Sequence, residues 1–194
     1  MQKGRLEAYT DAVLAILMTI LILGIKIPDE PTFEALFEIK EQLFAYILSF
    51  LLFTVYWNNH HHMFQLAEKI NGKVMWANSF WLFFLSLIPA ETSLVGTFMG
   101  GFAPEITYGV LFMLVSISYF FLNHILASAG GVDSAVYKAI EHDWKVPVTL
   151  VINGISLGLA CINPVLTLVG CYVVIIIWFI PNRRGGKFFL NRKP

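Results

Sequence analysis

Residues 5–28 read RLEAYTDAVLAILMTILILGIKIP, and this stretch decides the fold class. Between Ala8 and Ile27 only Asp11 and Lys26 carry a charge, and most of the other side chains are apolar. An α-helix needs about 20 such residues to cross the ~30 Å hydrocarbon core of a bilayer. The stretch therefore predicts a membrane-spanning helix over residues 8–27. Because no small-residue cleavage site precedes Pro28, we interpret it as a span and not as a cleaved signal peptide.

The composition of the chain indicates the same class. Of its 194 residues 57% are hydrophobic and only 13% are charged, the formal net charge is zero and the mean hydropathy is +0.70. So few charges cannot cover the surface of a soluble domain of this size. A neutral chain also shows no sign of nucleic-acid binding. We expect an all-α integral membrane protein that lies in the lipid bilayer and has no nucleic-acid partner.

Apolar runs of roughly 17–25 residues divide the chain into further spans. The pair Asn71-Gly72 is a turn signal, and Asn163-Pro164 interrupts a last apolar stretch that is too long for one helix. Gly154 and Gly158 lie one helical turn apart and predict a close helix contact in the fifth span. We predict one transmembrane domain over residues 1–194, with six helices at about residues 8–27, 43–66, 74–95, 106–127, 146–161 and 165–180.

The basic residues sort strongly between the two sides of such a chain. All but two of the 13 lysines and arginines fall on the side of the termini, and the exceptions, Lys26 and Lys40, lie between the first two predicted spans. Basic residues favour the cytoplasmic side of a membrane. We therefore expect both termini in the cytoplasm and a multi-pass protein of the cell (plasma) membrane. A five-span division would spoil this sorting.

The first predicted helix has an acidic residue and a continuous apolar edge. Asp11 near the start of a span is costly unless it is paired, although an acid at headgroup level beside a helix N-terminus is an equally good interpretation. At about 100° per residue, one side of the helix carries Ala12, Ile16, Thr19, Ile20, Leu23 and Ile27. An apolar edge is more typical of a lipid or packing face than of a pore wall, and periodicity alone does not choose between them.

The run His60-His61-His62 has the composition of a metal site but not its geometry. Consecutive helical residues diverge by about 100°, whereas ligand pairs on a helix sit at i, i+3 or i+4. We therefore predict no metal and no other cofactor. Buried polar groups need partners, so we expect instead a polar network that fixes the rotation of the first helix. Its predicted members are Arg5, Thr10, Asp11, His60, His61 and Asn78.

Three motifs in the first half of the chain resemble one known family. The first is Arg5-x-x-x-Tyr9-Thr10-Asp11, and the second is Trp57-x-x-His60-His61-x-x-Phe64. The third is FLSLIP at residues 84–89, with Asn78 before it and Thr92 and Gly96 after it. In this order they resemble the transmembrane protein 175 family, which comprises the lysosomal potassium channel and its prokaryotic relatives. The first motif of that family is Arg-x-x-x-Phe-Ser-Asp, so Tyr9 and Thr10 depart from it conservatively.

The resemblance implies a potassium-selective cation channel, with K⁺ as the permeant ion. It implies a homotetramer of six-helix subunits whose first helices line a central pore. No Thr-Val-Gly-Tyr-Gly filter occurs in the sequence, so selectivity would come from rings of side chains. By position Ile16 matches the constriction of the family, and Ile20 and Leu23 match the bulky residues one and two turns further on. Thr19 would add a ring of hydroxyls beside this hydrophobic gate.

Two other functions remain open at the level of sequence. A proton- or cation-coupled membrane transporter would use Asp11 and the histidines of the second helix, although the chain has no obvious internal repeat with broken helices. A non-transporting membrane scaffold or enzyme is favoured only by the histidine run. Because the sequence has no nucleophile–base pair, phosphate loop or paired carboxylates, we do not expect an enzyme.

Overall fold

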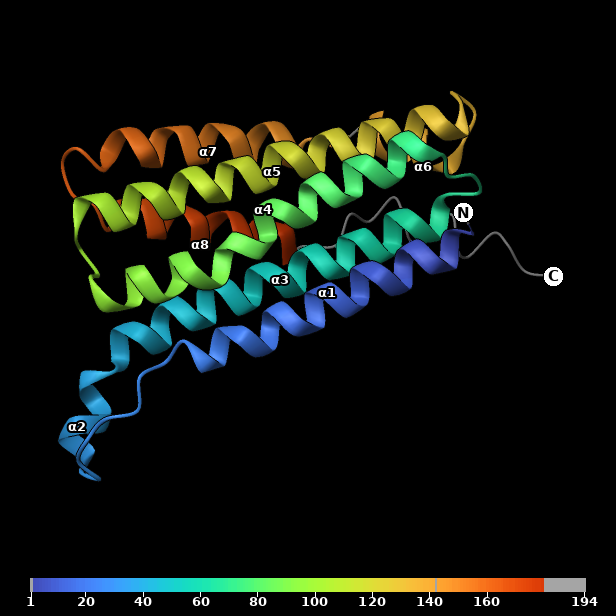
Figure 1. The fold of residues 1–194 in the computed structure, drawn as a ribbon. Coiled ribbons are helices and arrows are strands. Elements are labelled where there is room, and N and C mark those ends of the chain that lie inside the picture. Colours follow the sequence, from blue (N-terminus) through green and yellow to red (C-terminus); the bar gives the residue numbers. More distant parts are fainter. Residues whose placement is uncertain (1, 142, 180–194) are drawn as a thin grey trace.

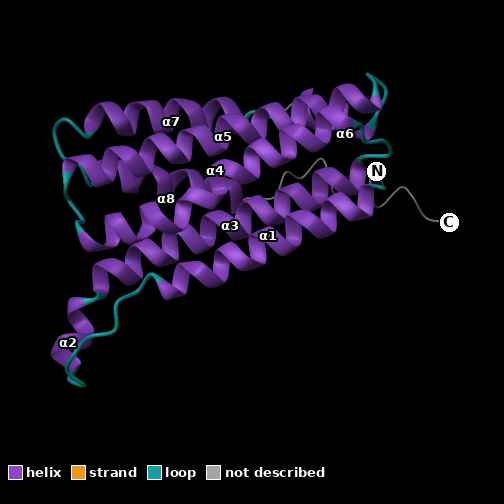
Figure 2. Ribbon diagram, in the orientation of Figure 1, coloured by secondary structure: helices purple, strands orange, loops and turns teal. Residues whose placement is uncertain are grey.

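The computed structural model describes residues 2–141 and 143–179. Every regular element of this part of the chain is an α-helix, and the long helices run side by side in one bundle (Figure 1, Figure 2). The helices are α1 (Lys3–Leu23), α2 (Phe33–Glu38), α3 (Lys40–Leu66), α4 (Gly72–Thr97), α5 (Phe102–Gly130), α6 (Ala135–Glu141), α7 (Lys145–Leu159) and α8 (Leu166–Phe179).

The first helix begins and ends earlier than residues 8–27. It starts at Lys3, so that the whole Arg5–Asp11 motif is helical, and it ends at Leu23. Glycine at position 24 disfavours continuation of the helix, and Pro28 restricts the residue before it to extended conformations. The chain beyond Gly24 is held by α3 instead, because the Lys26 amide donates to Gln42 Oε1 at 2.8 Å.

Two short helices, α2 and α6, occupy the polar connections for which we predicted no separate helix. The acidic segment after the first helix forms α2, and the Thr32 hydroxyl caps it by accepting a hydrogen bond from the Ala35 amide at 3.2 Å. Figure 1 shows α2 at the end of the bundle opposite to the N-terminus. The α6 helix lies at the same end of the bundle as the N-terminus.

Several helices have the length and apolar character that a membrane requires. Helices α1, α4 and α5 are long and apolar enough to cross a bilayer. Helices α7 and α8 are shorter apolar helices of 15 and 14 residues. The chain turns between them at Asn163, whose Oδ1 accepts a hydrogen bond from the Val165 amide at 3.1 Å. The protein is therefore a membrane protein with several apolar helices.

The packing leaves α1 at the edge of the bundle. Helices α4 and α5 form its centre, α7 and α8 pack on each other and on α5, and α1 packs mainly on α3 and α4 (Figure 1). Aromatic rings fill the core between α3, α4 and α5. The Tyr119 ring lies 5.1 Å from that of Tyr56 and 5.3 Å from that of Trp81. A helix at the edge has one face packed and one face uncovered.

The close helix contact expected at Gly154 and Gly158 does not form among the described residues. Both are exposed, and a Cβ at either position would meet no atom of the described residues within 4 Å. Close approaches occur at other glycines, among them Gly109 of α5, where a Cβ would overlap side chains of α8 and α7, and Gly170 of α8, where it would overlap a side chain of α7. These two glycines have no partner at i+4 spacing, so no small-residue motif marks them in the sequence.

Candidate functional site

The α1 helix has two faces of different character. Its buried residues recur every three or four positions and face α3 and α4; they are Leu6, Thr10, Leu14, Leu17 and Leu21. On the other side the exposed fraction is 58% for Ile16, 43% for Ile20 and 81% for Leu23, and Thr19 is exposed as well. All four residues predicted for the pore therefore lie on the face of α1 that the other described helices do not cover.

Thr19 is the single hydroxyl on this face beyond Ala12. Its Oγ1 donates a hydrogen bond to the Ile16 carbonyl oxygen of the preceding turn at 2.7 Å. The hydroxyl hydrogen is thus used within the helix, while the oxygen keeps a lone pair for another partner. An oxygen held in this way can act as a ligand for a cation and not as a donor for an anion.

A buried chain of hydrogen bonds joins α1 to α3 and α4. Asn78 Nδ2 donates to Thr10 Oγ1 at 2.9 Å, and the Asn78 Oδ1 lies 3.0 Å from His60 Nε2. The Thr10 hydroxyl in turn donates to the Leu6 carbonyl oxygen at 3.0 Å. All three side chains are buried. Because buried polar groups are costly without partners, these bonds hold α1 in one rotation.

The His60 imidazole stacks on two aromatic rings. Its centroid lies 4.1 Å from that of Phe64 and 5.3 Å from that of Trp81, with nearly parallel planes in each case. Because its ring stacks on Trp81 and its Nε2 lies next to Asn78, His60 contributes to the contact between α3 and α4. Within residues 2–141 and 143–179 no three His, Cys, Asp or Glu side chains are placed to share a metal ion.

Asp11 and His61 belong to a second, exposed set around Trp57. The Trp57 Nε1 donates to Asp11 Oδ1 at 3.0 Å, and the His61 ring stacks on the Trp57 ring at 5.9 Å. His61 Nε2 also lies 2.7 Å from Gln65 Nε2. Arg5 is exposed, and among the described residues its side chain joins neither set. The six residues predicted for one network are therefore distributed over two sets, with Arg5 outside both.

Lys3 makes a contact that the sequence does not predict. Its Nζ donates to the carbonyl oxygens of Phe64 at 2.9 Å and Ala67 at 3.1 Å. These carbonyls lie at the C-terminus of α3, where an ammonium group both fills orphan acceptors and complements the helix dipole. In the sequence Lys3 counts only as one basic charge near the N-terminus, because nothing there indicates that residues 3 and 64 are neighbours.

Comparison with known proteins covers almost the entire chain. Residues 5–89 match the family model described as the endosomal/lysosomal potassium channel TMEM175. A potassium channel of Chryseobacterium sp. (strain P1-3) is 37% identical over 187 residues, which are 96% of this chain and 97% of the relative. TMEM175 of Mus musculus, described as an endosomal/lysosomal proton channel, is 27% identical over 58% of this chain and 23% of its own length.

The fold is also known from a solved structure. The crystal structure of a lysosomal potassium-selective channel TMEM175 homologue from Chamaesiphon minutus superposes with a TM-score of 0.70 at 25% sequence identity. The match covers 94% of this chain and 97% of that one, so it includes the C-terminal helices that the family model leaves out. The protein belongs to the TMEM175 family of potassium channels, which is not a family of enzymes.

Proposed function

We propose that the protein is a potassium-selective cation channel of the plasma membrane, built from four identical subunits whose α1 helices surround a central pore. The observation that carries the proposal is the uncovered face of α1. In a subunit where α1 packs only along its buried side, Ile16, Thr19, Ile20 and Leu23 remain free to meet copies of themselves. Bacterial relatives named as potassium channels support the choice of ion.

In this proposal α1, α3, α4, α5, α7 and α8 cross the membrane, and both termini are cytoplasmic. The start of α1, the α3–α4 connection and α6 lie at one end of the bundle, and α2 lies at the other (Figure 1). Lys3, Lys69, Lys73 and Lys138 belong to the first end, which supports a cytoplasmic position for it. The basic residues at positions 183, 184, 187, 192 and 193 lie outside the described residues.

The proposed filter consists of side chains. Rings of Ile16, Ile20 and Leu23 around a shared axis would form a narrow apolar constriction, which closes by losing its water. The Thr19 oxygen would replace part of the hydration shell of the ion beside that constriction. Because K⁺ gives up its water more readily than Na⁺, such a ring favours K⁺, although less strongly than a cage of backbone carbonyls would.

The polar contacts of α1 support a fixed pore edge. A turn of α1 by one residue, about 100°, would carry Ile16 away from the axis. It would also break the bonds from Thr10 to Asn78, from Asp11 to Trp57 and from Lys3 to α3. The contacts therefore oppose rotation of the helix and support a channel whose filter does not depend on a separate loop.

Ion-replacement measurements on the purified protein in liposomes test the proposal. A channel passes K⁺ down its gradient without a coupling ion, and its reversal potential follows the K⁺ gradient when Na⁺ replaces K⁺ on one side. A coupled transporter using Asp11 and the histidines would require a proton or Na⁺ gradient for K⁺ movement. K⁺ flux that stops when that gradient is removed, or a reversal potential that follows protons alone, would contradict the proposal.

A further inference from the structure

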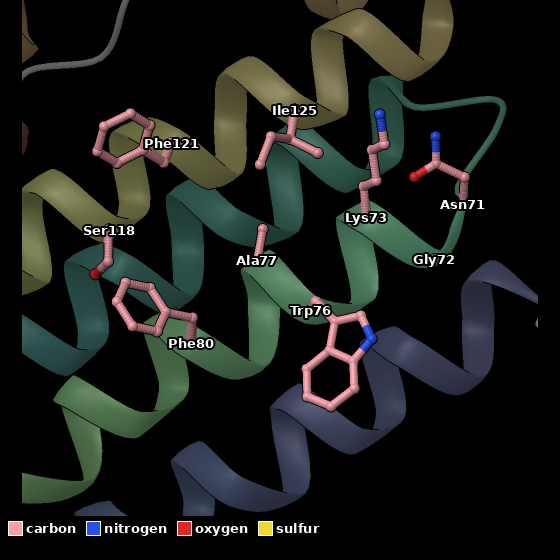
Figure 3. Close-up of a pocket in the computed structure, with 9 residues that line it drawn as sticks. All are labelled: Asn71, Gly72, Lys73, Trp76, Ala77, Phe80, Ser118, Phe121 and Ile125. Carbon is pink, nitrogen blue, oxygen red and sulfur yellow. The ribbon is translucent and has the colours of Figure 1, made fainter.

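An open groove of about 780 Å³ lies between α4 and α5. Its volume is within the ~300–1,000 Å³ typical of ligand sites. The groove begins where α4 begins and is lined mainly by apolar side chains (Figure 3). Asn71 and Lys73 line one end of the groove, and Trp76, Phe80 and Phe121 line its apolar part.

The polar and apolar parts of the groove are separated along its length. Figure 3 shows Lys73 and Asn71 at the end where α4 begins, and Phe80 and Phe121 further along. From Gly72 to Phe80 an α-helix rises about 12 Å, which is enough to pass from the headgroup level into the hydrocarbon core. Trp76 lies between the two parts with 80% of its side chain exposed, at the depth where membrane proteins place tryptophan.

The positive charge at the groove favours an anionic ligand. Lys73 is the one charged residue of the lining, which contains no carboxylate. The backbone at this end adds donors, because the first N–H groups of a helix have no intrahelical acceptor. Asn71 Oδ1 accepts a hydrogen bond from the Val74 amide at 3.1 Å. The amides of Gly72 and Lys73 can therefore donate to an acceptor outside the helix. Ammonium and amide groups together favour an anionic oxygen such as that of a phosphate.

We propose that this groove binds one anionic phospholipid, with its phosphate at Lys73 and an acyl chain along Trp76, Phe80 and Phe121. The apolar floor excludes a free inorganic anion as the complete ligand, and the lysine at its mouth distinguishes an anionic lipid from a zwitterionic one, whose own ammonium group opposes Lys73. A lysine at the surface of an anionic membrane contributes about 1 kcal/mol, which corresponds to about a five-fold preference. The site serves lipid binding and does not depend on which ion the pore conducts.

Quenching of Trp76 fluorescence by brominated lipids tests the proposal. The full chain is reconstituted in phosphatidylcholine vesicles with dibrominated phosphatidylglycerol or, at the same mole fraction, dibrominated phosphatidylcholine. The signal of Trp76 is the difference between the wild type and Trp76→Phe, since the chain has five tryptophans. We expect brominated phosphatidylglycerol to quench this signal at about one fifth of the concentration that brominated phosphatidylcholine needs.

Variants of Lys73 identify the source of the preference. Lys73→Gln should make the two lipids equivalent, and Lys73→Arg should keep the preference. The matched control is Lys138→Gln, which removes an exposed charge from α6 at the same end of the bundle but outside the groove. Equal quenching by both lipids in the wild type, or a preference that survives Lys73→Gln, overturns the proposal. Protection of Trp76 from both lipids also overturns it, because a neighbouring subunit would then fill the groove.

Discussion

At the scale of single residues, a hydrogen bond links Thr19 and Ile16. They lie on one exposed face of α1, and the Thr19 hydroxyl is oriented by the Ile16 carbonyl at 2.7 Å. Between residues 12 and 27 Thr19 is the single side chain with a hydroxyl. In the proposed pore it alone offers an oxygen, while Ile16 controls whether water fills the constriction.

Replacing Thr19 tests the role of its oxygen. Thr19→Val keeps the shape of the side chain but removes the oxygen, so we expect the permeability ratio of K⁺ to Na⁺ to fall about two- to ten-fold, as for the loss of an interaction of about 0.5–1.5 kcal/mol. Thr19→Ser keeps the hydroxyl and should keep most of the preference. Reversal potentials under bi-ionic conditions measure both. An unchanged ratio in Thr19→Val would show that another group selects the ion.

Replacing Ile16 tests the gate. Ile16→Asn puts an amide into the proposed constriction, so water should remain there and the resting K⁺ leak of liposomes should rise by several-fold or more. The control is Ile22→Asn, a second exposed isoleucine of α1 that points about 120° away from Ile16. Equal leaks in the two variants would mean that this face of α1 does not line the conduction path.

At the scale of the element, the position of α1 depends on contacts at both of its ends. Near its start Lys3, Thr10 and Asp11 bond to α3 and α4, and beyond its end the Lys26 amide bonds to Gln42. The leucines of its buried face supply the apolar contact in between. Apolar packing is not directional, whereas hydrogen bonds are, so the polar contacts decide the rotation of the helix.

Asn78 is the residue whose loss should loosen this contact most. Asn78→Ala leaves His60 Nε2 buried without a partner, at a cost of about 1–3 kcal/mol. We expect a lower midpoint of thermal unfolding for the detergent-purified protein. Asn58→Ala, at an exposed position of α3, should leave the midpoint unchanged. If the two variants unfold at the same temperature, the Thr10–Asn78–His60 chain does not stabilise the helix contact.

Lys3 should stabilise the end of α3 locally. In Lys3→Met the carbonyls of Phe64 and Ala67 lose a charged donor, which is worth about 0.3–1 kcal/mol at a helix C-terminus. Amide hydrogen exchange should accelerate about two- to five-fold in the last turn of α3 and the first turn of α1. Lys138→Met removes a charge at the same end of the bundle and should leave both turns unchanged. Acceleration in both variants would indicate a general charge effect instead.

At the scale of the whole molecule, the helix bundle leaves one face of α1 uncovered. The α1 helix lies at the edge of the bundle, and three of its four proposed pore residues are large apolar side chains exposed by 43–81%. Apolar exposure towards lipid carries no penalty, so these side chains alone do not require a partner. The proposed assembly around a shared axis accounts for another feature: polar contacts fix α1 along one side and leave its other side uncovered.

Cysteine cross-linking tests that assembly. With Cys161→Ser and Cys171→Ala as background, Leu23→Cys places one thiol per subunit on the proposed inner edge. Mild oxidation should give covalent dimers in high yield, and native mass spectrometry of the same sample should give a mass of four subunits. Ile155→Cys, on the exposed surface of α7, should stay monomeric in denaturing gels. Cross-linking at residue 155 and not at residue 23 would place a different helix at the axis.

The membrane class of this protein and the apolar edge of α1 could be predicted from the sequence, because both depend on local properties. Periodicity alone does not say whether that edge faces a pore. Hydropathy over about 20 residues predicts a span, and a period of 3.6 residues predicts the edge that carries Ile16 and Leu23. The resemblance to the family rests on three motifs in the first half of the chain, around Asp11, around His60 and at residues 84–89. The bounds of α1 were less accurate, because helix ends depend on partners such as Gln42 that lie outside the helix.

Only the tertiary structure decided which polar groups meet. His60 and His61 are equivalent in the sequence, yet the rotation of α3 places one in the core beside Asn78 and the other beside Trp57 at the surface. Lys3 and Phe64, 61 residues apart, become neighbours through the packing of α1 on α3. Hydropathy and helical period are local quantities along the chain, whereas a hydrogen bond between helices requires two groups that are distant in the sequence to meet at a suitable distance and angle. Only the packed bundle sets that geometry.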